Sequence, residues 1–145
     1  LEGIFHLFWL GGVYLDVLPL MSKNVLHWSS ADVATWATFV LAQEKFRSSF
    51  LQHDISGPFL LKLTNDALRT ELNIVSYGLR VMLIQEIELL EKTHHNIQSA
   101  QDQGKESAAL STKRDLYFHF QNLMDSRITH LSSLSLSSLP SPSPP

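Results

Sequence analysis

The 145-residue sequence contains no cysteine. This absence excludes disulfide bonds and metal sites built on thiolates. The formal net charge is only −3, which gives no general attraction to nucleic acid or to an anionic membrane. A glycine-rich phosphate loop and a Gly-x-Ser-x-Gly nucleophile elbow are also lacking. We therefore expect a protein that is not an enzyme, holds no cofactor and resides in the cytoplasm.

The first twenty residues are apolar from Ile4 to Leu20 and carry two acids and no base. A run of this length would suit a signal peptide or a short membrane span. However, no Lys or Arg precedes it, and Asp16 inside a span would cost ~3 kcal/mol near the bilayer centre. Because Met21-Ser22-Lys23 resembles a natural start, we interpret residues 1–21 as an apolar leader or gene-model remnant. A membrane anchor over residues 4–20 is the alternative.

The segment from Trp28 to Leu90 has the periodicity of short helices, and no strand pattern competes with it. Ser29 with Asp32 comes close to a capping box at the start of the first helix. Further helices are predicted at residues 43–52 and 59–61, and after Thr64 and Ser76, which are suitable N-caps. The positions predicted to form the core are Trp28, Val33, Trp36, Ala37, Val40, Phe46, Phe50, Leu68, Leu72, Leu83, Ile84, Ile87 and Leu90.

This order of residues resembles the SAM (sterile alpha motif) family. The opening pattern of the family is filled by Trp28, Ser29, Asp32, Val33 and Trp36. Its middle and last patterns are filled by Phe50, Ile55-Ser56-Gly57, Leu60-Leu61, Leu63-Thr64, Leu72, Ile74 and Ser76-Tyr77-Gly78-Leu79-Arg80. The chain departs from the family at Ser56, Leu79, Val81 and Met82, where many members have Asp, His and two basic residues. The middle signature most resembles SAM domains of fungal polarity and kinase-cascade adaptors.

The resemblance implies an all-α fold, a five-helix SAM-type bundle over residues 22–93 with a long C-terminal helix. It also implies a protein–protein interaction module that mediates homo- or hetero-oligomerisation in a signalling or scaffold protein. The expected partner is another SAM domain, of this protein or of a different one. Nucleic acid is not expected as a partner, and neither is a membrane unless residues 4–20 are a genuine anchor.

By resemblance, SAM domains use two binding surfaces. The mid-loop face, often acidic, corresponds here to His53, Asp54, Asn65, Asp66 and Glu71, beside Gln52. The end-helix face corresponds to Ser76, Tyr77, Gly78, Leu79, Arg80 and Met82, beside Val75. A helix N-terminus attracts an acidic patch through its free N–H groups and dipole. Each residue also has a plain alternative: Tyr77 covers its own helix ends, Arg80 is solvated, and Gly78 serves internal packing.

An RNA-hairpin-binding SAM domain is the alternative function. That mode needs clustered Lys and Arg at the start of the last helix, where only Arg80 is basic. The pair Glu91 and His94 has a metal-like spacing on one helical face. A metal site would need further ligands from other helices, so we interpret the pair as a solvated last turn.

The remainder of the chain divides by composition. Residues 94–112 are predicted to be a polar linker into which the last helix fades, and residues 113–131 a separate amphipathic helix. That helix either packs on the SAM core or binds a partner, because it cannot bury its apolar stripe alone. Residues 132–145 contain only Ser, Leu and Pro and are predicted to be a disordered tail. The Pro-x-x-Pro spacing in this tail is a weak hint of an SH3-type contact.

Overall fold

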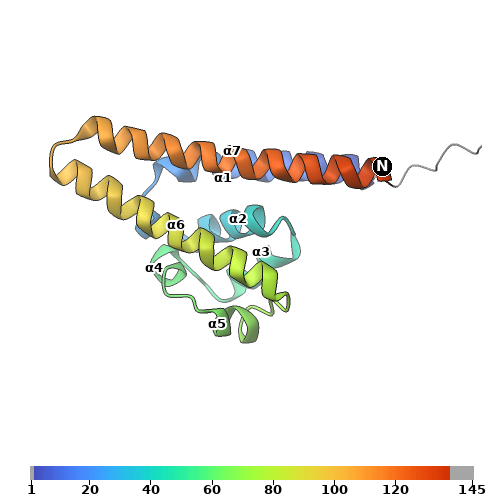
Figure 1. The fold of residues 1–145 in the computed structure, drawn as a ribbon. Helices are drawn as coiled ribbons and strands as arrows, with labels where there is room; N and C mark the ends of the chain where they lie inside the picture. The colour runs from blue at the N-terminus through green and yellow to red at the C-terminus, as the bar shows by residue number, and fades with distance from the viewer. Residues whose placement is uncertain (1, 138–145) are drawn as a thin grey trace, which may run out of the picture.

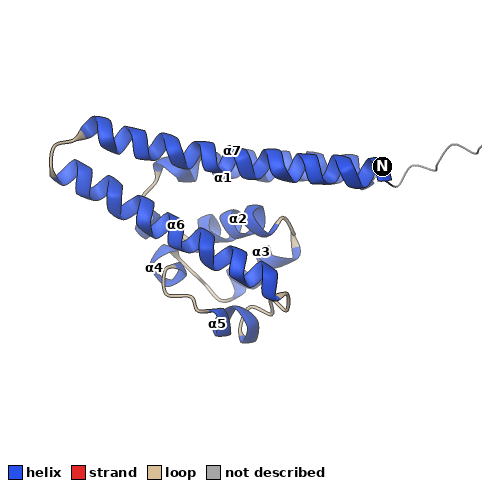
Figure 2. Ribbon diagram, in the orientation of Figure 1, coloured by secondary structure: helices blue, strands red, loops and turns tan. Residues whose placement is uncertain are grey.

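The computed structural model describes residues 2–137 of the chain, with side chains from 4 to 130. Within these residues the fold contains helices only, as the sequence predicts (Figure 2). In chain order they are α1 (Glu2–Val17), η1 (Leu18–Ser22), η2 (Val25–His27), α2 (Ser30–Leu41), α3 (Lys45–Gln52), α4 (Gly57–Leu60), α5 (Asn65–Thr70), α6 (Tyr77–Asp102) and α7 (Glu106–Ser137). The five predicted helices of the bundle correspond to α2 to α6.

The helix starts predicted from capping residues are confirmed. Ser29 and Asp32 form a complete capping box at the start of α2. The Thr64 hydroxyl accepts a hydrogen bond at the start of α5, and the Ser76 hydroxyl does so at the start of α6. Burial alone would raise the pKa of Asp32. An ion pair with Lys23 at 2.8 Å and hydrogen bonds from Ser29 outweigh burial and hold that pKa below its usual value.

Helix α2 lies at the centre of the molecule. Trp36 on one face packs against Trp28, with ring centroids 6.1 Å apart. Phe39 on another face packs against Tyr14 of α1 and Phe120 of α7, at 5.6 Å and 5.9 Å. The predicted core positions are buried apart from Ile84, which is partly buried. A helix buried on several faces needs cover from more than one side, and here α1 and α7 provide part of it.

Gly57 allows a close approach between two backbone segments of the domain. Its N–H donates to the carbonyl oxygen of Trp28 at 2.9 Å. A Cβ at this position would lie 1.7 Å from the carbonyl oxygen of Val25. Only glycine therefore fits where α4 meets η2, which explains the glycine in the middle of the predicted signature.

The polar linker predicted over residues 94–112 is replaced by a helical hairpin. Helix α6 continues to Asp102, a short turn follows, and α7 begins at Glu106. Gly104 adopts a left-handed conformation in the turn, with a φ of 72°. Polar side chains are compatible with helix when one face is solvated, so polarity did not mark a break here. The structure thus corrects the predicted boundaries at this point.

Helix α7 packs on the bundle along much of its length, so it is not a separate element. Leu116 and Phe120 are buried, and Leu123 and Met124 are partly buried against the core. These residues belong to the predicted apolar stripe, and packing on the SAM core is the alternative that the structure supports. Residues 132–137 of the predicted tail continue α7. The rest of that tail, with its Pro-x-x-Pro spacing, lies outside the described residues.

Helix α1 packs antiparallel beside α7 and above α2 (Figure 1). Its residues Leu10, Val13 and Val17 are buried, and the indole N–H of Trp9 donates to Glu44 at 2.8 Å. Of the described residues, only Ile4–Ser22 is long and apolar enough to cross a membrane by length and composition. The structure places this segment in the fold, whereas its interpretation as a leader, remnant or anchor remains a prediction.

Candidate protein-interaction site

Three of the five predicted mid-loop residues line a groove between the end of α3 and the helices α4 and α5. His53, Asp54 and Glu71 line this groove together with Phe59. Phe59 is 60% exposed. It was predicted only to be part of a short helix, and not to be a binding residue. An exposed aromatic ring between acidic side chains is the kind of residue that anchors protein interfaces. The groove therefore combines an exposed aromatic ring with two acidic side chains.

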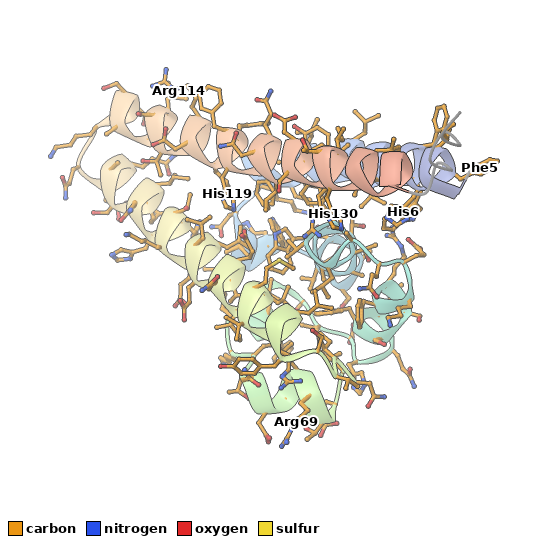
Figure 3. All side chains as sticks on the ribbon, turned by 45° about the vertical axis from the view of Figure 1, so that its right-hand side comes forward. Phe5, His6, Arg69, Arg114, His119 and His130 are labelled. Atoms are coloured by element: carbon orange, nitrogen blue, oxygen red, sulfur yellow. The ribbon has the colours of Figure 1, made fainter. Side chains whose placement is uncertain are left out.

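The charges around this groove are not equivalent. Asp54 accepts a hydrogen bond from the Ser30 hydroxyl and has a left-handed backbone. Asp66 forms an exposed ion pair with Arg69 at 2.7 Å, and Arg69 lies at the outer end of α5 (Figure 3). Asp66 lies outside the residues that line the groove. The acidic character of the groove therefore rests mainly on Asp54 and Glu71.

The start of α6 presents exposed apolar residues. Val75 is 84% exposed and Tyr77 is 69% exposed. Gly78 is also exposed, and a Cβ there would meet only the Ser76 hydroxyl, at 3.9 Å. Internal packing therefore does not require this glycine, which contradicts the plain alternative for Gly78. We call this open end of the domain, which consists of Val75, Ser76, Tyr77 and Gly78, the α6 tip.

Arg80 does not belong to the α6 tip, and its prediction as an exposed interface cation is corrected. Its side chain is buried at 8% exposure. The guanidinium donates to Asn65 at 2.8 Å and to the carbonyl oxygens of Ile74 and Val75 at 2.7 Å and 2.8 Å. It thereby satisfies two backbone carbonyls of the α5–α6 loop. Arg80 is a structural residue, and Asn65 serves as its partner.

Leu79 and Met82 are also turned towards the fold. Both are partly buried and pack against the core. The sulfur of Met82 lies 3.8 Å from the guanidinium of Arg127 on α7. The Lys or Arg that is common at this position in the family would be repelled by the positive charge of Arg127. A methionine at position 82 is therefore compatible with the packing of α7. Of the predicted end-helix residues, Ser76, Tyr77 and Gly78 remain available for a partner.

Polar contacts also hold α7 in place. Figure 3 shows His119 on the side of α7 that faces α6 and Arg114 on the opposite side. The imidazole of His119 lies 2.7 Å from the carboxylate of the buried Glu86. Arg127 donates to the carbonyl oxygen of Val40. Burial lowers the pKa of the Arg127 guanidinium, and the nearby Glu86 raises it. These contacts tie α7 to α2 and α6.

No group of three or more His, Asp or Glu side chains in the described part of the chain is arranged to hold a metal ion. Glu91 and His94 line one pocket on α6, where Glu91 is exposed and His94 is partly buried. Contrary to the prediction, the pair does not lie in the last turn of its helix, because α6 continues to Asp102.

Residues 25–91 match the family model described as SAM domain (Sterile alpha motif). This segment is a SAM domain, a non-catalytic fold that serves protein–protein interaction. The chain is also similar to the inactive protein tyrosine kinase pTKL of Plasmodium falciparum (isolate 3D7), with 29% identity over 81 residues. The similarity covers 56% of this chain but only 5% of the length of that relative. No solved structure matches the chain.

Proposed function

We propose that this SAM domain binds another SAM domain head to tail, with the α6 tip of one domain in the mid-loop groove of the other. The observation that carries the proposal is the α6 tip itself. Val75 and Tyr77 are among the most exposed large apolar side chains of the described residues. Such exposure costs free energy in water and is relieved by a partner.

The groove supports the same arrangement from the other side. Exposed Phe59 offers an apolar contact for Tyr77, and aromatic pairs of this kind contribute about 0.5–1.5 kcal/mol beyond their burial. Asp54 and Glu71 at the edge of the groove would face the free N–H groups of the partner's α6. A carboxylate near a helix N-terminus typically contributes about 0.3–1 kcal/mol.

Salt dependence follows from the burial of Arg80. It is the only basic residue from Val75 to Met82, and its charge is used inside the domain. Association should therefore depend on apolar contact and a helix dipole more than on full charges, and should weaken only slightly as salt rises. The same absence of an exposed cation disfavours the RNA-hairpin alternative, which needs phosphate contacts.

The experiment uses the whole chain with one face damaged at a time. Tyr77→Ala impairs the α6 tip, and Phe59→Ala impairs the groove. Each variant alone should lose self-association in light scattering across protein concentrations. An equimolar mixture should recover one intact interface and give a 1:1 pair without longer assemblies, because a head-to-tail contact uses two different surfaces.

Tyr117→Ala is the matched control, because Tyr117 is an exposed tyrosine on α7, away from both surfaces. It should associate like the unmodified chain. If the chain is monomeric alone, the same variants are tested against the SAM domain of a partner. The proposal fails if Tyr77→Ala and Phe59→Ala both keep full association while melting normally.

At the level of the cell, we propose a scaffold or signalling role in the cytoplasm. The similarity to a protein named as an inactive tyrosine kinase supports a signalling context, and the absence of cysteine is compatible with a reducing compartment. Cell fractionation of the tagged chain tests the location, and recovery mainly in membranes would contradict it.

A further inference from the structure

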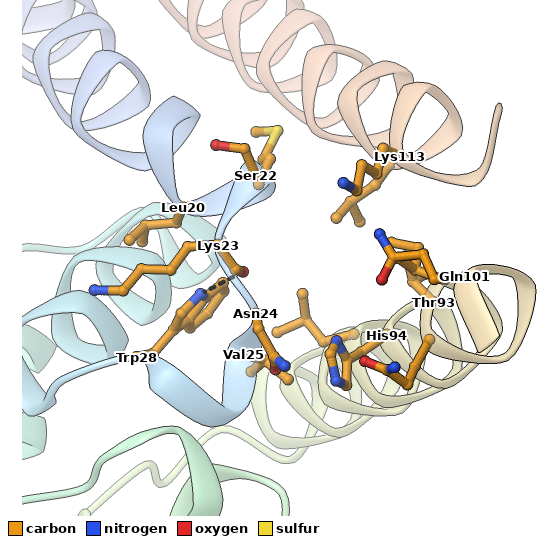
Figure 4. Close-up of a pocket in the computed structure, with 15 residues that line it drawn as sticks. Leu20, Ser22, Lys23, Asn24, Val25, Trp28, Thr93, His94, Gln101 and Lys113 are labelled. Atoms are coloured by element: carbon orange, nitrogen blue, oxygen red, sulfur yellow. Dashed lines mark hydrogen bonds between the residues drawn. The ribbon is translucent and has the colours of Figure 1, made fainter. Parts of the chain in front are cut away.

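A cavity lies where the SAM domain meets the α6–α7 hairpin, away from the groove and the α6 tip. It is lined by the η1–η2 segment, the C-terminal half of α6 and the N-terminal part of α7, and is partly open to solvent (Figure 4). Its volume is about 180 Å³. An apolar cavity of about 150 Å³ is large enough to bind benzene, so this cavity has room for one aromatic ring or a short acyl chain.

Part of the cavity wall is apolar. Val25, Trp28, Leu90 and Leu116 contribute to it, and all four are buried in the core. The indole N–H of Trp28 is already satisfied by the carbonyl oxygen of Lys23 at 3.1 Å. This wall therefore offers apolar surface to a ligand, and no hydrogen-bonding group of the indole would be left unpaired.

The remaining lining residues include polar side chains, and the only charges in the lining are positive. Figure 4 shows Lys113 and Gln101 across the cavity from Trp28, with His94 between them and the η2 segment. None of the fifteen lining residues is Asp or Glu. Lys23, the other lysine of the lining, is already paired with Asp32 at 2.8 Å.

Lys113 differs from Lys23 in having no partner. It is partly buried, yet its ammonium makes no ion pair or hydrogen bond with any described residue. His94 and Gln101 likewise have side-chain donors that remain available. The ammonium of Lys113 is therefore free to pair with an anion that enters the cavity.

We propose that this cavity binds a small carboxylate with one aromatic ring or a short acyl chain. The carboxylate would pair with Lys113 and accept from Gln101, and the apolar part would lie against Trp28 and Leu116. One unpaired ammonium balances a single negative charge, so a monoanion fits better than a phosphate dianion. The ligand would contact η2, α6 and α7 together, and would therefore stabilise the docking of the hairpin.

The test uses the whole chain and 3-phenylpropionate as the probe. Binding is followed through the indole N–H signal of Trp28 in two-dimensional NMR spectra, and through the melting temperature. We expect a saturable shift by about 10 mM probe and a higher melting temperature. No saturable shift in this range would overturn the proposal.

Two comparisons isolate the role of the ammonium. Lys113→Gln should weaken binding by at least about tenfold, the typical effect of a lost charge-assisted hydrogen bond. Arg114→Gln is the matched control and should leave binding unchanged, because Arg114 lies on the opposite side of α7. Equal binding by Lys113→Gln and Arg114→Gln would refute the site.

Ligand analogues keep the test independent of variant folding. The uncharged 3-phenylpropanol should bind at least about tenfold more weakly than 3-phenylpropionate to the unmodified chain. If the alcohol binds equally well, the cavity is a simple apolar hole and the assignment to an anion is wrong. If phenyl phosphate binds more tightly than the carboxylate, the assignment to a monocarboxylate is wrong.

Discussion

Phe120→Ala measures whether α7 belongs to the same cooperative unit as the SAM domain. Phe120 is 1% exposed, and its ring contacts Phe39 of α2. Burial of a Phe side chain contributes about 1.5–3 kcal/mol, the aromatic pair about 1 kcal/mol, and the cavity left behind adds to the loss. The higher helix propensity of alanine offsets about 0.5 kcal/mol of this loss. The expected loss in the free energy of unfolding is therefore about 3–4 kcal/mol.

Phe118→Ala is the control on the same helix. Phe118 is 54% exposed, so its replacement should change the free energy of unfolding by less than about 0.5 kcal/mol. Urea denaturation followed by tryptophan fluorescence compares the two variants, because Trp28 and Trp36 are buried in the SAM domain. A melting temperature lower by on the order of 10 °C for Phe120→Ala would agree. Equal, small losses for both variants would refute the docking of α7.

Three further predictions concern the SAM domain. Gly57→Ala should cost about 3 kcal/mol in urea denaturation because its Cβ collides with backbone, whereas Gly78→Ala has room and should be neutral or stabilising; equal effects would contradict this geometry. Arg80→Lys should cost about 3 kcal/mol by breaking the hydrogen bonds to the α5–α6 loop. If this variant melts normally but no longer associates, Arg80 acts at the interface and not in the fold. Because the pKa of Asp32 is lowered, its stabilising contribution is present above about pH 4 and is lost as pH falls further. Asp32→Asn should therefore destabilise more at about pH 7 than at about pH 2, and a uniform loss at both would argue against the ion pair.

The sequence was informative wherever a local rule decided the structure. Ser29, Thr64 and Ser76 cap helices because each hydroxyl reaches the backbone N–H three residues on, which is a purely local event. Trp36 could be assigned to the core because helical period and residue type agree. The mid-loop and end-helix surfaces depended on resemblance to a family. The structure brings His53, Asp54 and Glu71 to one groove and leaves Ser76, Tyr77 and Gly78 exposed, while their binding role stays a prediction.

The failures occurred where a distant segment decided the outcome. Arg80 appeared to be a surface cation, but the carbonyls of Ile74 and Val75 capture it once the α5–α6 loop folds back. Met82 was assigned to the end-helix face, but it is partly buried and contacts Arg127 of α7, 45 residues further along the chain. Phe59 was assigned to the fold because periodicity does not show whether an apolar residue of a four-residue helix faces inward. Such facts depend on tertiary contacts that no local pattern contains.

One signal for the wider fold was nevertheless present in α2. The helix that contains Trp36 also carries Phe39 and Leu41, so its apolar residues are not confined to one stripe. A helix of this kind must be covered on more than one side, and the SAM bundle covers only part of α2. The uncovered surface requires apolar helices from elsewhere in the chain, and the strongly apolar segments flanking the domain are those that contain Leu10 and Phe120. Helices α1 and α7 therefore form one core with the SAM domain. A fragment limited to residues 22–93 would lack both helices and would expose Phe39 to water.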